Sequence, residues 1–98
     1  MFTTLVFYRE PENPDEFRSL YQAHLDIARR LPLIKGAESY LADQGNAVEA
    51  WWVTALHWGS RTDMEAAFAS EVGRELGADI ARLGASPAFS LSLEAQDL

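Results

Sequence analysis

The segment WWVTALHW, residues 51–58, decides the fold. It is rich in aromatic and β-branched residues, which favour strands, and we expect it to belong to a strand over residues 49–58. Successive side chains of a strand point to opposite faces of its sheet. One face would carry Trp51, Val53, Ala55 and His57, and the other Trp52, Thr54, Leu56 and Trp58. Because both faces carry tryptophan and aliphatic side chains, we expect apolar surfaces to cover the sheet on both sides.

The residues before this segment predict a strand, a helix and a second strand. Residues 2–8 are dense in β-branched and aromatic side chains and predict the first strand. Asn13, Pro14 and Glu16 have the spacing of a helix N-terminus with Asn13 as N-cap, and Pro32 would end this helix at about Leu31. Residues 36–42 alternate weakly, and turn residues 43–46 would join them to the strand 49–58 as a β-hairpin.

The residues after this segment predict a second helix with a break. The pattern Thr62-x-x-Glu65 is a capping box and predicts a helix over residues 64–69. Ser70-Glu71 indicates a kink or a restart. A stripe of apolar residues at helical spacing then runs from 72 to 83 and ends at Gly84, which suits the left-handed residue after a helix.

Residues 89–94 alternate apolar and polar side chains and complete the order βαββαβ. This order is typical of a ferredoxin-like α+β sandwich, an antiparallel sheet with both helices on one face. We expect one such domain over residues 1–98. The apolar face that the helices leave uncovered would pack against a second copy, which predicts a homodimer with the two sheets face to face.

Composition and charge restrict the partners of the chain. Eight Lys and Arg against 15 Asp and Glu give a net charge of −7, which repels nucleic acids and anionic membranes. No apolar run approaches the roughly 20 residues that span a bilayer, and the first residues lack a signal-peptide pattern. The absence of cysteine excludes disulfides and thiolate chemistry. We expect a cytoplasmic protein that binds neither nucleic acid nor membrane.

His24 is the residue that points to a function. It lies in the apolar stripe of the first helix, which comprises Phe17, Leu20, Tyr21, Ile27, Ala28 and Leu31. A histidine in that stripe can be a hydrogen-bonded core residue, a general acid or base that faces a cavity, or a metal or haem ligand. Tyr21, one turn earlier on the same side, is a second catalytic candidate that would polarise a substrate oxygen, although core packing explains it as well.

Further candidates come from the strand 49–58 and the late helix. Trp52, Trp58 and His57 are predicted ligand-binding residues, because apolar pockets are lined by aromatic side chains with a few polar groups. Core or dimer packing explains the tryptophans equally, and a solvated or interface position explains His57. Asp79 lies near the apolar stripe of the late helix, where a carboxylate is costly unless it is paired or lies at the boundary with water, and a solvated position at the helix edge is the simpler explanation. No HExxH spacing, Gly-rich phosphate loop or nucleophile elbow occurs, so no metal, nucleotide or other cofactor is predicted.

Three segments resemble the EthD-like family of dimeric α/β-barrel proteins: residues 17–32, residues 50–68 and residues 70–80. The resemblance implies a ferredoxin-like protomer, a dimeric barrel, and a match between His24 and the histidine common in this helix of the family. EthD-like proteins are associated with oxidative breakdown of small organic compounds, and the wider superfamily includes cofactor-free oxygenases, isomerases and cyclases. Leu33 and the run His57-Trp58-Gly59 depart from the family pattern, which changes the expected pocket mouth.

Two functions follow from these observations. The first is a small-molecule enzyme or accessory protein of catabolism, a cofactor-independent oxidoreductase, isomerase or cyclase in which His24 moves a proton on an apolar or aromatic, oxygenated compound and Tyr21 orients it. The alternative is a non-catalytic ligand-binding or dimeric assembly module in which His24 makes a structural hydrogen bond. A cavity of roughly a few hundred Å³ beside His24 favours the enzyme, and a filled core with His24 bonded to a backbone carbonyl favours the module.

Overall fold

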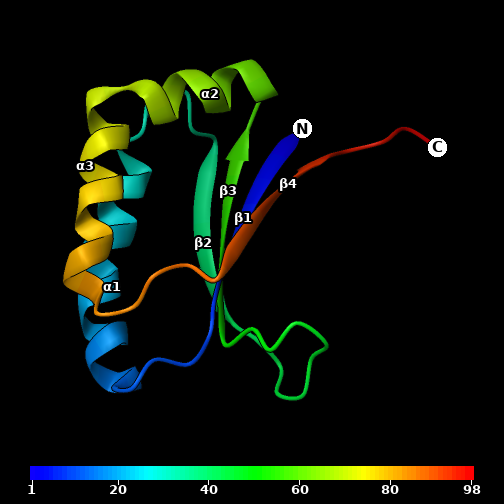
Figure 1. Ribbon diagram of the computed structural model, residues 1–98. Coiled ribbons are helices and arrows are strands. Elements are labelled where there is room, and N and C mark those ends of the chain that lie inside the picture. The colour runs from blue at the N-terminus through cyan, green and yellow to red at the C-terminus, as the bar shows by residue number, and fades with distance from the viewer.

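The computed structural model describes residues 1–98 and confirms the predicted order of elements (Figure 1). The elements are β1 (Phe2–Tyr8), α1 (Pro14–Arg29), β2 (Gly36–Leu41), β3 (Trp52–Trp58), α2 (Arg61–Ala69), α3 (Glu71–Asp79), the 3₁₀ helix η1 (Ile80–Leu83) and β4 (Phe89–Glu94). The second helix of the βαββαβ pattern is thus divided into α2, α3 and η1. None of the helices combines the length and the apolar character that crossing a membrane requires.

The four strands form one antiparallel sheet in the order β2-β3-β1-β4. The central strand β1 pairs Leu5 with Ala55 of β3 on one side and with Leu91 of β4 on the other. The predicted hairpin is confirmed, with Glu38 of β2 opposite Ala55. The helices α1 and α3 lie side by side over one face of the sheet, and the other face has no helix (Figure 1). This arrangement is the ferredoxin-like α+β sandwich.

The beginning of α1 confirms the predicted N-cap at Asn13. The side chain of Asn13 accepts a hydrogen bond from the backbone N–H of Glu16 at 3.1 Å, and its amide donates to the Glu16 carboxylate at 3.2 Å. Pro14 occupies the first turn, where its missing N–H costs nothing. The helix ends at Arg29, two residues before the predicted end at Leu31.

The beginning of α2 differs from the prediction. Ser60 is the N-cap, because its Oγ accepts the N–H of Asp63 at 3.2 Å, so the helix begins at Arg61 and the predicted cap Thr62 lies inside it. The predicted restart at Ser70 is confirmed, since this serine ends α2 and its Oγ caps α3. Gly84 after η1 has a φ of 70°, the left-handed conformation that was predicted for it.

The two faces of the sheet differ in what covers them. The face under the helices contributes Tyr8, Leu56 and Trp58 to the buried core together with Phe17 of α1. The predicted split of residues 51–58 holds from Trp52 onward. Trp51 departs from it because β3 begins only at Trp52, and the ring of Trp51 packs edge-on against Phe17, 5.5 Å between centroids.

The opposite face of the sheet, here called the open face, is largely apolar. Its side chains are Thr3, Leu5 and Phe7 of β1, Glu38 and Tyr40 of β2, Val53, Ala55 and His57 of β3, and Phe89, Leu91 and Leu93 of β4. Phe7 and Phe89 stack across the strands with centroids 4.5 Å apart. Leu91 and Leu93 remain 40% and 48% exposed, so the apolar side of β4 points away from the helices.

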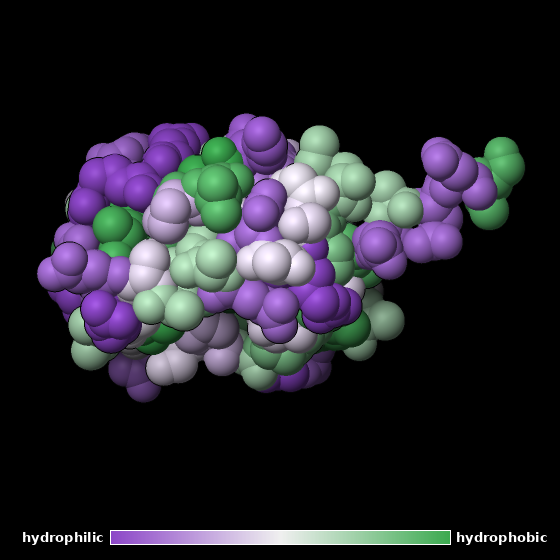
Figure 2. All heavy atoms as spheres, turned by 90° about the horizontal axis from the view of Figure 1, so that it is seen from above, coloured by the Kyte–Doolittle hydropathy of each residue, from purple (hydrophilic) through white to green (hydrophobic).

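Residues 95–98 follow β4 as an extended tail that projects from the body of the molecule (Figures 1 and 2). In the view from the α2 end, polar and apolar residues are interspersed on the surface (Figure 2). The tail lies away from the interior between the helices and the sheet, where the candidate site is found.

Candidate active site

A cavity of about 230 Å³ lies between the helices and the covered face of the sheet. Its lining comes from every element except β2: Val6 and Tyr8, Tyr21, His24 and Ala28, Thr54 and Leu56, Phe68, Leu76 and Gly77, Ile80, Pro87, and Ser90. Most of these side chains are apolar, and the polar ones are hydroxyls and one imidazole. This composition is typical of a pocket for a small, largely apolar molecule that is oriented by a few polar groups.

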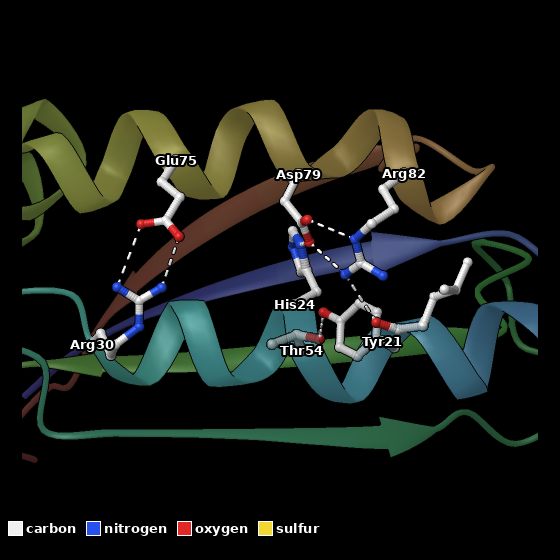
Figure 3. Close-up of polar contacts among 8 residues, drawn as sticks. Tyr21, His24, Arg30, Thr54, Glu75, Asp79 and Arg82 are labelled. Carbon is white, nitrogen blue, oxygen red and sulfur yellow. Dashed lines mark hydrogen bonds and ion pairs between the residues drawn. The ribbon is translucent and has the colours of Figure 1, made fainter.

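His24 projects from the middle of α1 toward α3 and is only 5% exposed (Figure 3). Its Nδ1 lies 2.8 Å from Oδ2 of Asp79, the last residue of α3. Its Nε2 has no hydrogen-bond partner. Nε2 nevertheless keeps some contact with solvent, because the one fully buried side-chain nitrogen or oxygen without a partner is Trp52 Nε1. Because a carboxylate accepts the Nδ1 proton, the neutral ring keeps a free lone pair on Nε2.

Arg82 of η1 holds the Asp79 carboxylate in place. Its Nε donates to Oδ1 at 2.7 Å and its terminal nitrogen to Oδ2 at 2.8 Å, and the same nitrogen donates to the Leu20 carbonyl at 3.1 Å (Figure 3). The Arg82 hydrogen bonds, aided by the one with His24 and opposed by burial, lower the pKa of Asp79 to about 2. Asp79 is therefore ionised across the physiological range and accepts from His24.

A group of hydroxyls lies on the sheet side of the cavity. The Tyr21 hydroxyl is hydrogen-bonded to Thr54 Oγ1, which is in turn 2.9 Å from Ser39 Oγ. Burial raises the pKa of Tyr21 against the lowering effect of its hydrogen bond with Thr54. Burial also raises the pKa of Tyr8, helped by the neighbouring Tyr21 hydroxyl. Both tyrosines therefore stay protonated. Tyr8 can donate a hydrogen bond to an oxygen atom, and Tyr21 can do the same when Thr54 is the donor in their shared bond.

The structure brings two of the five predicted site residues together at the cavity. Tyr21 and His24 both line it, with ring centroids 5.2 Å apart. Trp52 packs on Phe17 and Tyr21 beside the cavity without lining it. Trp58 is fully buried, and its indole N–H donates to the Thr4 hydroxyl at 3.2 Å.

His57, the remaining predicted ligand-binding residue, lies on the open face. Its Nδ1 is 3.1 Å from the Thr3 hydroxyl and its Nε2 is 2.5 Å from Glu38 Oε1. Both ring nitrogens are thus engaged by residues of the neighbouring strands β1 and β2. The sheet itself separates His57 from the cavity.

Two residues of the site were not predicted. Asp79 is the paired carboxylate and not the solvated edge residue, because the His24 and Arg82 contacts leave its side chain only 14% exposed. The sequence predicts Tyr8 only as the end of the first strand, but it is 1% exposed and lines the cavity. Its even position on a strand whose even-numbered side chains face the helices was the available signal.

Comparison with known proteins supports the fold and gives one sequence relative. No family model matches the chain. An uncharacterized 11.0 kDa protein in the thcB-thcC intergenic region of Rhodococcus erythropolis is 27% identical over 84 residues, which cover 83% of this chain and 82% of the relative. The alignment thus extends over most of both proteins.

Solved structures share the fold at low sequence identity. An ethyl tert-butyl ether D (EthD) family protein from Bacillus halodurans superposes with a TM-score of 0.81 at 14% identity, covering 98% of this chain and 99% of the other. A dimeric ferredoxin-like protein of unknown function from Jannaschia sp. superposes with a TM-score of 0.68 at 18% identity, covering 96% of this chain and 98% of the other. SnoaB, a cofactor-independent oxygenase from Streptomyces nogalater, superposes with a TM-score of 0.66 at 13% identity, covering 99% of this chain and 92% of the other. The chain therefore has the ferredoxin-like fold of this EthD family protein, which confirms at the level of the fold the resemblance seen in the sequence.

Proposed function

We propose that this chain is an EthD-like acid–base enzyme that moves a proton on a small, largely apolar, oxygenated compound, with His24 as the base. The observation that carries the proposal is the geometry of His24: Nδ1 bonded to an ionised Asp79, and Nε2 unpartnered beside a cavity of about 230 Å³. His24 is bonded to a carboxylate and not to a backbone carbonyl, and the core beside it is not filled. Both features favour the enzyme over a purely structural histidine.

The first step would be removal of a proton next to a carbonyl or from a phenol. Nε2 of His24 takes the proton, and the electron pair stays on the substrate as an enolate or phenolate. Asp79 stabilises the imidazolium that forms, because its negative charge lies 2.8 Å from Nδ1. Return of the proton to another atom gives an isomerisation or cyclisation, and reaction of the anion with dioxygen gives an oxidation that needs no bound cofactor.

The hydroxyls of Tyr8 and Tyr21 suit the substrate oxygen. Both tyrosines line the cavity and keep their protons because their pKa values are raised. A protonated phenol in a partly dry site can donate a hydrogen bond to an oxygen that gains negative charge. In this proposal His24 handles the proton, and the tyrosines orient the substrate and stabilise its oxygen.

The open face supports a homodimer as part of the same proposal. Its apolar side chains, among them Leu91 and Leu93, are exposed in the single chain, and such a patch on a soluble domain favours an interface. A structural relative with the same fold is described as dimeric. Packing two open faces would bury these side chains and leave the cavities on the outer, helix-covered sides.

The experiment that tests this function uses carbon acids as probes. Proton NMR in D₂O would follow deuterium exchange next to the carbonyl of acetophenone and 2-indanone, with and without the protein. We expect acceleration by the wild type and a loss of about 1,000-fold or more in His24→Gln, whereas His57→Gln stays within about threefold. Equal exchange with wild type and His24→Gln, in folded proteins, would overturn the proposal.

One observation favours the alternative function, a binding or assembly module. Three polar contacts hold α3 and η1 against α1: Asp79 with His24, Arg82 with the Leu20 carbonyl, and the Arg30–Glu75 ion pair at 2.8 Å (Figure 3). The contact between His24 and Asp79 therefore also has a structural explanation. Under this alternative, His24→Gln lowers the thermal midpoint as much as Arg30→Gln does and changes no ligand property. Under the proposed function, ligand binding and exchange respond to His24→Gln and not to Arg30→Gln.

A further inference from the structure

Gly77 of α3 is a lining residue of the cavity that has no local structural reason to be glycine. It lies inside the continuous helical run of α3 and η1, and its backbone does not have positive φ. A Cβ built at this position meets no atom within 4 Å. Glycine in a helix interior weakens the helix relative to alanine, so the choice of glycine here needs another cause.

Gly73, one turn earlier in the same helix, shows what a structural requirement looks like. A Cβ at position 73 would lie 2.3 Å from the carbonyl oxygen of Phe68, which is backbone and cannot move aside cheaply. Gly73 therefore permits the close junction of α2 and α3. Gly77 has no such contact, and the space beside it is empty.

The empty space beside Gly77 belongs to the mouth of the cavity. Gly77, Phe68 and Ser90 are exposed lining residues, whereas His24 at the inner end is 5% exposed. Asp79, two residues after Gly77, points from α3 toward α1. Because two residues correspond to about 200° around a helix, position 77 faces away from α1. Phe68 of α2 and Ser90 of β4 line the cavity together with Gly77.

We propose that Gly77 keeps the mouth of the cavity open and sets the size of the compound that reaches His24. This inference rests on the proposed function, since it concerns the ligand of the same cavity. A side chain at position 77 would stand at the rim between α3 and β4 without disturbing the core. The compounds admitted are small apolar molecules whose reactive oxygen lies inside, near Tyr8 and His24, and whose far end passes Gly77.

The test measures entry into the cavity without needing a substrate. Diethyl pyrocarbonate transfers an ethoxycarbonyl group to a neutral imidazole nitrogen with release of ethanol and carbon dioxide, and peptide mass spectrometry separates His24 from His57, the two histidines of the chain. The rate at His24 would be compared in wild type, Gly77→Ala, Gly77→Leu and Ala78→Leu. Ala78 is the matched control, because it is exposed on the same helix and does not line the cavity.

We expect Gly77→Leu to slow modification of His24 about tenfold or more, and Ala78→Leu to leave it within about twofold. Gly77→Ala should raise the thermal midpoint by about 2 to 8 °C, which shows that glycine is not needed for folding. An unchanged His24 rate in folded Gly77→Leu would overturn the inference, as would a thermal midpoint that falls in Gly77→Ala. Neither outcome depends on turnover, so the deuterium-exchange experiment judges the proposed function separately.

Discussion

The two histidines of this chain lie on opposite faces of one sheet, and they differ in what their ring nitrogens contact. His24, on the covered side, uses Nδ1 for Asp79 and leaves Nε2 without a partner beside the cavity. His57, on the open face, has Nδ1 near Thr3 and Nε2 near Glu38. A ring with one fixed and one free nitrogen can exchange a proton with a bound molecule, whereas a ring with both nitrogens engaged cross-links strands.

The two faces of the sheet also differ in the side chains that they present. The covered face holds hydroxyls and a cavity under α1 and α3, while the open face presents Phe7, Phe89 and leucines with no cavity. One sheet therefore separates a surface suited to a small molecule from a surface suited to another protein chain.

The largest effect is expected at Asp79, the carboxylate that contacts His24, and Glu38, the carboxylate that contacts His57, provides the control. Asp79→Asn keeps the shape of the side chain but removes the charge and replaces one carboxylate oxygen with an NH2 donor, so the side chain no longer fixes the His24 tautomer. We therefore expect the deuterium-exchange rate to fall about 1,000-fold. Glu38→Gln makes the equivalent change beside His57 and should leave the rate within about threefold. The comparison fails if both variants lose activity equally, or if neither does.

The next effect concerns the open face. Leu91→Lys places two charges in the proposed dimer interface, one from each chain, and should weaken dimerisation about 100-fold by sedimentation equilibrium. Val48→Lys is the control, since Val48 is similarly exposed, at 46%, in the loop before β3. Equal dimer dissociation constants for the two variants would show that the open face is not the interface.

The smallest effect is the acid dependence of stability. The pKa of Asp79 is lowered from 3.8 to about 2 in the folded chain, so its contribution is complete above about pH 4 and is lost as the pH falls through 2. Near neutral pH, we expect urea unfolding at fixed protein concentration to give wild type a free energy of unfolding about 2 kcal/mol larger than that of Asp79→Asn. Below about pH 2 the two free energies should be equal. A pH-independent difference would contradict the ion pairs seen at Asp79.

Most of the fold could be predicted because its signals are local. The N-cap at Asn13, the restart at Ser70 and the left-handed Gly84 each depend on residues a few positions apart, and the structure confirms all three. The error at Ser60 has the same origin, since Ser60 and Thr62 are both good caps and only the direction of the chain after β3 selects between them.

The candidate site could be predicted only in part because its contacts are distant in sequence. Periodicity places Tyr21 and His24 on one face of α1, but Asp79 is 55 residues from His24. Its contact with His24 depends on how α3 packs beside α1, which no local pattern specifies. The same holds for Trp52 and Trp58: periodicity puts them on the covered face, and only the packing shows that neither lines the cavity.

The tautomer of His24 is the most direct test of the central claim. Long-range proton–nitrogen NMR correlation in alkaline solution, where imidazole is neutral, distinguishes a protonated ring nitrogen from a bare one, and His24→Gln assigns the signals. The geometry predicts a proton on Nδ1 and a bare Nε2 that shifts when 2-indanone is added. A proton on Nε2, or a bare Nε2 that does not respond to any carbon-acid probe, would contradict the assignment of His24 as the base.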